Sequence, residues 1–383
     1  LAIIAILAND LSLERFGLWF SVLAIFQIFL FADFGLSTVV ARRLHDERFC
    51  NRSLISTALK TQLCVILSLS PISYVLLDQI FSISQLNKPP IFLLGISTIA
   101  LSCTNINRSF LRTMGHASRE INISIIDRGL TLLLLLFSRH LIGGTEISYI
   151  ISFIAGPVVG FIYSYILVNL ELPQSIKEHS VFSSKDIFHE SLPFAIDSIL
   201  NPLSESTTRI LILFFSGASS VAIFEIAWKV FIGGGAIIRS LRKSMLSAFS
   251  ANQSLPQELA ISFENSAKLV NWLAPLGIFF GSIGAFLIPI VFSDEYHDSI
   301  LVFLVLLGTW TVMLIGSTFQ VAVQSLLPGN RYLLLTGMGT FLQIVLAVVL
   351  IKNWGAVGAS ASVFLGQTIM VIISVILTRK MPP

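Results

Sequence analysis

The chain has 383 residues, of which 55% are hydrophobic and only 12% are charged. Together with a mean hydropathy of +0.86, this composition excludes an ordinary soluble domain and fits a helical protein that crosses a membrane many times. The net charge of +3 does not indicate nucleic-acid binding, because the basic residues lie in loops between apolar segments.

Apolar runs near the length of a membrane-spanning helix recur along the whole chain. They predict an all-α integral membrane protein with twelve transmembrane helices, at 1–8, 16–40, 54–77, 91–114, 121–137, 147–168, 192–215, 221–241, 267–292, 300–326, 332–351 and 356–377. The chain begins at Leu1 inside an apolar run, so we expect the first helix to be truncated. A polar linker at 171–190 separates an N-terminal six-helix bundle, 1–170, from a C-terminal six-helix bundle, 191–383.

The loops alternate in basic content, which predicts how the chain is threaded through the membrane. One set of loops is rich in Lys and Arg: Arg42, Arg43, Arg48, Arg52, Arg112, Arg119, Lys177, Lys185, Arg239, Arg242, Lys243, Arg331, Arg379 and Lys380. The intervening loops hold few basic residues: Arg15, Lys88, Arg139 and Lys352. By the positive-inside rule, the first set faces the cytoplasm, together with the linker and both termini.

Residues 191–230 read as two spanning helices joined by a turn at 216–220, yet they carry several charges. A charge at the centre of a spanning helix costs about 2.5–3.5 kcal/mol on insertion scales, so these side chains must face one another, water or a polar ligand. On the first helix every fourth residue is polar, so four side chains share one face: Asp197, Asn201, Glu205 and Arg209.

The second helix of this pair places Glu225 and Lys229 four residues apart. Counted from the turn, Arg209 and Glu225 lie at similar depth, so we expect them to pair across the two helices. Two interpretations remain open: the helix pair lines a polar cavity, or the charges form a buried ion-pair network that holds a bundle together.

Four further charges fall within predicted spans, in roughly the inner third of the bilayer by residue count: Asp33, Arg108, Asp127 and Arg128. For Arg108 and Arg128, snorkelling to the inner interface is the alternative to binding an anion. For Asp33, capping a helix end or pairing with an arginine is the alternative to a role in transport. Trp310 lies deeper than the other tryptophans, so stacking on a sugar is an alternative to packing there.

The sequence holds no motif of an enzyme, a metal site or a cofactor site. It lacks HExxH, a nucleophile elbow and a Walker loop. Cys50, Cys64 and Cys103 have neither metal-ligand nor redox spacing, and the histidines are scattered over predicted loops. We therefore expect a protein that is not an enzyme and that uses no cofactor or metal.

Three stretches resemble the polysaccharide flippases of the MATE-like superfamily, the Wzx type that moves lipid-linked O-antigen units. They are ERFGLWFSVLAIFQIFLFADFGLS in the second predicted helix, IFEIAWKV in the eighth, and VQSLLPGNRYLLLTGMGTFLQIVLAVVLIKNWGAVGASAS near the C-terminus. The pattern covers nearly the whole chain. The resemblance implies two six-helix bundles that form a V around a central cavity, with alternating access and no use of ATP.

The resemblance also implies a substrate and its binding residues. The substrate is an oligosaccharide on undecaprenyl diphosphate, moved across the bacterial cytoplasmic (inner) membrane in O-antigen and lipopolysaccharide biosynthesis. Partners expected beside the bilayer are a polysaccharide polymerase and a chain-length regulator. The implied substrate-binding and cavity residues are Arg209, Lys229, Asn201, Arg108 and Arg128. The implied ion-coupling or pairing acids are Asp197, Glu205, Glu225, Asp33 and Asp127.

Two other functions are weighed against the flippase. A cation-coupled multidrug antiporter on a related fold fits less well, because its cavity is expected to be dominated by acids. A membrane glycan polymerase or ligase is expected to carry a large extracytoplasmic loop, whereas the outward loops predicted here are short and hold no acid or histidine cluster for general acid–base chemistry.

Overall fold

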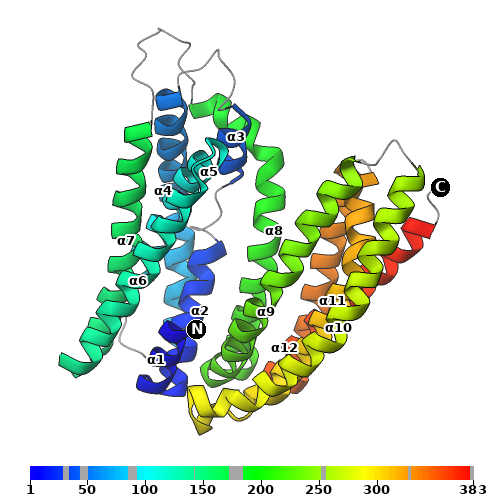
Figure 1. Cartoon of the computed structure of the whole chain (residues 1–383). Helices are drawn as coiled ribbons and strands as arrows, with labels where there is room; N and C mark the ends of the chain where they lie inside the picture. Colours follow the sequence, from blue (N-terminus) through cyan, green and yellow to red (C-terminus); the bar gives the residue numbers. More distant parts are fainter. Residues whose placement is uncertain are drawn as a thin grey trace. The chain divides into compact units, whose positions relative to one another are not determined.

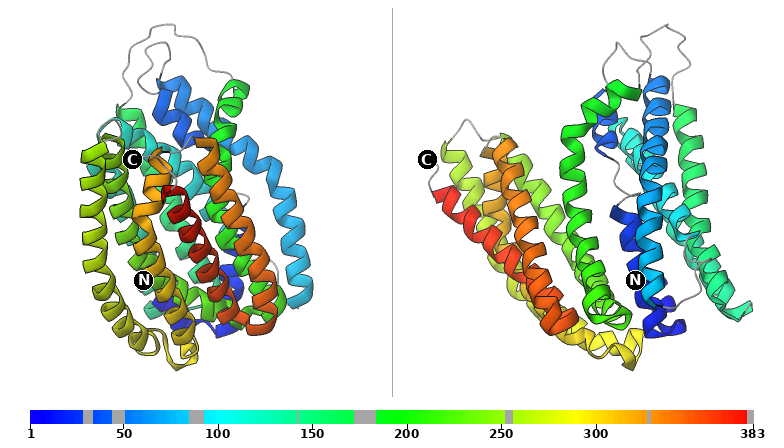
Figure 2. Two further views of the ribbon diagram at one scale, coloured as in Figure 1. Left: turned by 90° about the vertical axis from the view of Figure 1, so that its right-hand side faces the viewer. Right: turned by 180° about the vertical axis from the view of Figure 1, so that it is seen from behind.

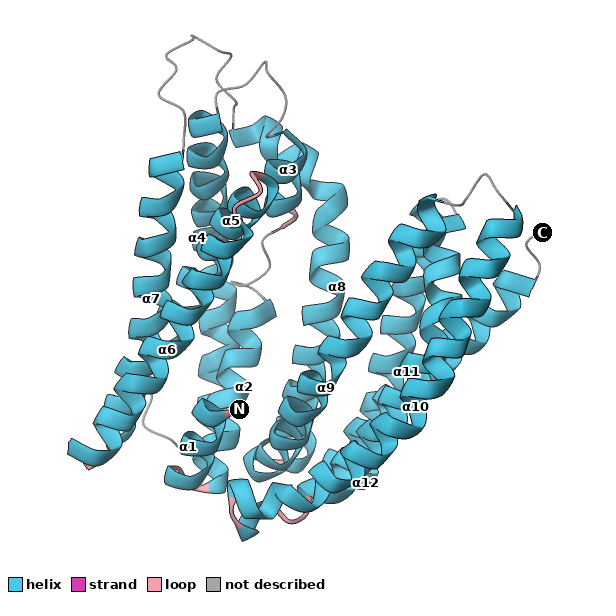
Figure 3. Cartoon of the chain, in the orientation of Figure 1, coloured by secondary structure: helices cyan, strands magenta, loops and turns pink. Residues whose placement is uncertain are grey.

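The computed structural model describes residues 1–28, 34–43, 51–84, 93–141, 143–171, 184–251, 256–326 and 329–379. Within these ranges the regular structure is helical (Figure 3). The helices are α1 (Ala2–Asp10), α2 (Leu13–Phe26), α3 (Leu36–Arg43), α4 (Asn51–Ser84), α5 (Leu94–Thr113), α6 (Ala117–Leu141), α7 (Glu146–Glu171), α8 (Ser184–Ser216), α9 (Ala218–Ala251), α10 (Pro256–Phe292), the 3-10 helix η3 (Asp294–Tyr296), α11 (Ser299–Leu326) and α12 (Gly329–Arg379) (Figure 1).

The predicted helices correspond to these elements in order, with two local differences. The span predicted at 16–40 is divided into α2 and α3, and the turn before α3 holds Phe34 (φ 48°) and Gly35 (φ 75°) in the left-handed region, where helical hydrogen bonding stops. The last two predicted helices appear as the single element α12, but Gly355 (φ 54°, ψ −130°) breaks its backbone between them, close to the predicted boundary.

Seven helices in the described part of the chain are long and apolar enough to cross a membrane. Their candidate spans are Ser53–Val75, Ala117–Leu141, Glu146–Glu171, Ala218–Leu246, Ile261–Phe292, Ser299–Ser325 and Thr336–Arg379. Large apolar side chains face outward on them, such as Trp272 and Ile290, each 77% exposed. The protein is therefore a multi-pass membrane protein, and the full count of twelve spans stays a prediction.

The contacts between helices group the chain into two compact units. The N-terminal unit is Ser21–Ser206, and the C-terminal unit is Ile3–Phe20 with Thr207–Pro383. This boundary passes through α2 and α8, so it differs from the expected division at 171–190. The expected bundles, 1–170 and 191–383, stay a prediction.

Contacts at the ends of α1 and α10 explain why the first residues group with the C-terminal helices. The Asn9 amide donates a hydrogen bond to the Val291 carbonyl (3.1 Å), and the Tyr296 hydroxyl donates one to the Ala8 carbonyl (3.4 Å). The ring of Phe16 meets Tyr296 edge-on, with 5.9 Å between the ring centroids. These contacts fix α1 and the start of α2 against η3.

The rest of the C-terminal unit is a bundle in which α11 packs against α9, α10 and α12. These helices run beside one another in both views of Figure 2. The N-terminal unit is built around α5 and α7, with α6 against α7 and α4 and α3 against α5. Polar contacts join its helices: Gln62 donates to Ser102 (2.6 Å), Asn107 donates to Ser164 (2.9 Å), and Ser138 lies 3.0 Å from Ser152.

Candidate functional site

The α8–α9 hairpin turns at a single residue, Gly217, which has φ of 83°. The turn is thus tighter than the predicted 216–220. Glycine takes this left-handed conformation without steric cost, so the two helices fold back sharply against each other. Arg209 and Glu225 stand at equal sequence distance on either side of Gly217, which brings them to the same depth.

Glu225 lies between two cations. The Arg209 Nε donates a hydrogen bond to Glu225 Oε2 at 2.7 Å, and Lys229 Nζ lies 2.8 Å from Glu225 Oε1. The Glu225 side chain is 0% exposed, Arg209 is 3% exposed and Lys229 is 26% exposed. Lys229 also sits over the Phe20 ring, 5.2 Å from its centroid. The predicted pairing of Arg209 with Glu225 is therefore confirmed.

This Glu225 cluster (Arg209, Glu225 and Lys229) carries one negative and two positive charges, so its formal net charge is positive. Both contacts to the carboxylate are short, and the one from Arg209 is a charge-assisted hydrogen bond. Burial of Arg209 and Glu225 agrees with the ion-pair-network interpretation of the sequence. The partial exposure of Lys229 leaves one cation within reach of an anion, and the cavity-lining role stays a prediction.

The other predicted residues of this stretch are less informative. Glu205 is half-buried on α8. The side chains of Asp197 and Asn201 lie outside the described residues, although the backbone of α8 passes through both positions. Asp33 also lies outside the described residues. Their roles stay predictions.

A second cluster of one acid and two cations lies in the N-terminal unit. Asp127 on α6 is 1% exposed, and its Oδ2 lies 3.6 Å from Arg108 of α5 and 3.7 Å from Arg128. Gly160 of α7 allows the close approach, because a Cβ there would come within 3.1 Å of the Asp127 Cβ. Neither Asp127 oxygen has a hydrogen-bond partner among the described residues.

In this Asp127 cluster (Arg108, Asp127 and Arg128) the two arginines differ in exposure, although the sequence analysis gave both of them the same two alternatives. Arg128 is 58% exposed, in keeping with snorkelling, whereas Arg108 is 18% exposed and points to Asp127. Sequence reasoning did not pair Arg108 with Asp127, because the two lie on different helices at unequal distances from the turn between them. The pairing depends on the register of α5 against α6, which would have to be known before the contact could be predicted.

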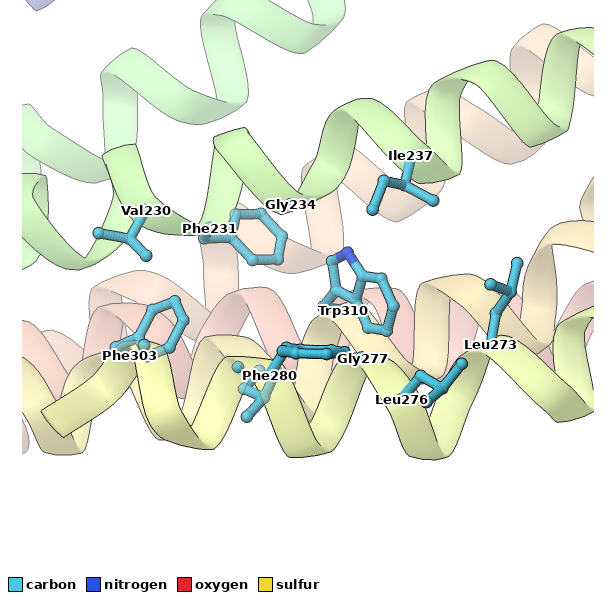
Figure 4. Close-up of a pocket in the computed structure, with 13 residues that line it drawn as sticks. Val230, Phe231, Gly234, Ile237, Leu273, Leu276, Gly277, Phe280, Phe303 and Trp310 are labelled. Atoms are coloured by element: carbon cyan, nitrogen blue, oxygen red, sulfur yellow. The ribbon is translucent and has the colours of Figure 1, made fainter. Parts of the chain in front are cut away.

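An apolar pocket of about 440 Å³ lies between α9, α10 and α11 (Figure 4). Trp310 stands between Gly234 and Gly277, and a Cβ at Gly277 would collide with its ring. Trp310 is only 6% exposed and packs against Gly277, which agrees with the packing alternative, and sugar stacking stays a prediction. Sequence reasoning missed the pocket, although the glycines that line it, at 234, 277, 281 and 284, were visible in the sequence.

In the described part of the chain, no group of three or more His, Cys, Asp and Glu residues could hold a metal ion. The Glu225 and Asp127 clusters each combine one buried acid with two cations. Each cluster is suited to bind an ion or to exchange a proton rather than to make or break bonds between heavier atoms.

Comparison with solved structures shows which fold this is. The inward-facing structure of a multidrug resistance MATE family transporter of the MOP superfamily matches with a TM-score of 0.76 at 17% identity, covering 99% of this chain and 92% of that one. Lipid II flippase MurJ, in an inward closed conformation, matches with a TM-score of 0.71 at 15% identity, covering 100% and 86%. A MOP superfamily transporter from Pyrococcus furiosus matches with a TM-score of 0.61 at 17% identity, covering 98% and 87%.

Comparison of sequences shows the family. The capsular polysaccharide biosynthesis protein CapF of Staphylococcus aureus is 22% identical over 229 residues, which span 56% of this chain and 57% of CapF. The chain thus matches little more than half the length of this curated relative. The model of the polysaccharide biosynthesis protein family, Polysacc_synt, matches residues 1–231, more than half of the chain. The chain therefore belongs to the polysaccharide biosynthesis protein family, and its fold is that of the MATE-like transporters of the MOP superfamily.

Proposed function

We propose that this protein flips an oligosaccharide repeat unit, linked to a polyprenyl diphosphate, across the cytoplasmic membrane. The observation that carries the proposal is the Glu225 cluster, in which one buried acid holds two cations and Lys229 remains partly exposed. A diphosphate is too polar to cross hydrocarbon unaided, so its carrier needs positive charge inside the membrane. Family membership in polysaccharide biosynthesis and a fold shared with a lipid II flippase support this choice of substrate.

The proposed mechanism is alternating access between two six-helix bundles in a twelve-span chain with both termini in the cytoplasm. Lys229 meets the diphosphate first, because it is the exposed cation of the Glu225 cluster. Protonation of Glu225 frees Arg209 to join it, which couples the transfer to an ion gradient. Arg108, Arg128 and Asn201 complete the polar path, and the further coupling or pairing acids are Asp33, Asp127, Asp197 and Glu205. No ATP and no covalent step is required.

A transport assay on the full chain tests the proposal. The gene is deleted in the bacterium that carries it, and the deletion strain is complemented with the wild type, with Lys229→Gln or with Lys268→Gln. Lys268 is the matched control, because it pairs with Glu264 at an exposed site in a four-residue spacing like that of Lys229 and Glu225. We expect surface polysaccharide to return with the wild type and Lys268→Gln, while Lys229→Gln accumulates lipid-linked oligosaccharide on the cytoplasmic face.

The assay separates the flippase from the alternatives. Full surface polysaccharide with Lys229→Gln, at equal protein level, would remove Lys229 from substrate binding. Unchanged polysaccharide in the deletion strain itself, with increased drug sensitivity, would favour a multidrug antiporter. Loss of polymerised glycan while single repeat units still reach the outer face would favour a polymerase or ligase.

A further inference from the structure

A groove of about 840 Å³ lies within the N-terminal unit, between α4, α5 and α7. Most of its wall is apolar, formed by Ile55, Leu59, Leu63, Ile96, Ile99, Ala100, Cys103, Val158, Phe161 and Val168. Its remaining lining residues carry polar groups: Ser53, Ser56, Lys60, Tyr165 and Asn169. The volume is in the range of about 300–1,000 Å³ that is usual for small-molecule sites. None of these residues belongs to the Glu225 or Asp127 cluster.

The polar residues gather at one end of the groove. α4 begins at Asn51 and α7 ends at Glu171, and these two helix ends lie at the same end of the unit (Figure 1). Ser53, Ser56 and Lys60 share one face of the first turns of α4, because they are spaced by three and four residues. Ile96 and Ile99 come from the first turns of α5, which runs in the opposite direction. The groove therefore has a polar mouth and an apolar body.

Lys60 is the one charged residue among the described residues that line the groove. Lys60 is exposed and lies within the candidate span Ser53–Val75. No carboxylate in the described part of the chain forms an ion pair with it. Glu171, two residues beyond Asn169 on α7, is already engaged by His116 (2.9 Å) and by Arg119. A lone cation at this depth favours an anion beside it.

The surface around the groove is suited to hydrocarbon. Leu63 is 44% exposed, Ile96 is 45% exposed and Leu67 is 69% exposed. On α7, Ile162 and Ile166 are 51% and 50% exposed. A ligand that fits both the apolar body and the cationic mouth must itself be apolar along most of its length and anionic at one end.

We propose that this groove binds one anionic glycerophospholipid of the surrounding bilayer. Its phosphate lies against Lys60, its ester and glycerol oxygens accept hydrogen bonds from Ser53, Ser56 and the Asn169 amide, and one acyl chain follows Leu63 and Ile99. The headgroup enters at the interface and the chain stays at hydrocarbon depth, so no polar group of the lipid is buried without a partner. The site is independent of the transported substrate.

Native mass spectrometry of the delipidated full chain in detergent tests the proposal. The probes are phosphatidylglycerol, which is anionic, and phosphatidylcholine, which is zwitterionic, with identical acyl chains, so that the two lipids differ only in the headgroup. We expect the wild type to retain a single phosphatidylglycerol with a preference of about tenfold or more over phosphatidylcholine, as one charge-assisted contact gives. Lys60→Gln should abolish the preference, and Lys60→Arg should keep it.

Lys268→Gln is the control, because Lys268 is exposed within another candidate span but already paired with Glu264. It should keep the wild-type preference. Equal binding of the two lipids by the wild type, as expected if Lys60 merely snorkels, would overturn the proposal. A preference that survives Lys60→Gln, or that Lys268→Gln also removes, would overturn it too. Displacement of phosphatidylglycerol by an equimolar polyprenyl phosphate would assign the groove to that lipid instead. Displacement by inorganic phosphate would show that the acyl chains do not contribute to binding, which would also overturn the proposal.

Discussion

The Glu225 and Asp127 clusters have the same composition, one acid with two cations, but different geometry. Both contacts to Glu225 are short, at 2.7 and 2.8 Å, whereas those to Asp127 are 3.6 and 3.7 Å. The Arg209–Glu225 contact is a charge-assisted hydrogen bond and the Lys229–Glu225 contact is a close ion pair, whereas both contacts to Asp127 are longer ion pairs. Equal formal charge therefore does not mean equal energetic importance, and removal of each charge should show the difference.

The largest effect is expected from Glu225→Gln. The substitution keeps the size of the side chain but leaves Arg209 buried beside an uncharged group, which should lower the free energy of unfolding by about 3–5 kcal/mol. Thermal unfolding in detergent and the amount of protein in the membrane measure it. The control is Glu264→Gln, since Glu264 is 67% exposed in its pair with Lys268 and its replacement should leave the unfolding transition nearly unchanged. A similar cost for both variants would contradict the importance of burial.

A smaller loss is expected from Asp127→Asn. Its partners are farther away, and Arg128 already reaches solvent, so the loss should be about 1–2 kcal/mol. The same unfolding measurement applies, with Ser124→Ala on α6 as a control outside the cluster. If Asp127→Asn proves as costly as Glu225→Gln, the longer distances do not indicate a weaker network.

The second cation of the Glu225 cluster should matter more for transport than for stability. Lys229 is 26% exposed, so Lys229→Gln should lower the free energy of unfolding by only about 1 kcal/mol while it abolishes most transport. Surface polysaccharide and thermal unfolding are compared for the same variant. Parallel loss of both would make Lys229 a purely structural residue.

The smallest effect is expected from Arg128→Gln. Arg128 is 58% exposed and lies 3.7 Å from Asp127, so stability should change by no more than about 0.5 kcal/mol. Arg108→Gln should cost more, because Arg108 is 18% exposed and has the closer contact. The pair of unfolding curves sharpens the comparison, and an equal cost would mean that exposure does not distinguish the two arginines.

Local features of the helices were predictable because hydrophobic length and residue spacing are properties of the sequence alone. The match of α4 to α12 with the predicted helices follows from apolar runs, and the Arg209–Glu225 pair follows from a symmetric hairpin. The break between α2 and α3 was missed, because most of the run 16–40 is apolar and a single glycine, Gly35, does not by itself mark a turn. The Arg108–Asp127 contact was missed, because the register between α5 and α6 depends on how both pack against α7.

The sequence by itself determined the membrane class, the order of the helices and the family resemblance, since each rests on composition and short-range pattern. Only the tertiary structure decided that α1 is held by Tyr296, that Trp310 fills the space left by Gly277, and that Lys60 opens onto a groove shared with α5 and α7. These contacts join residues far apart in the chain. They depend on shape complementarity between whole helix faces, which no periodicity within one helix encodes.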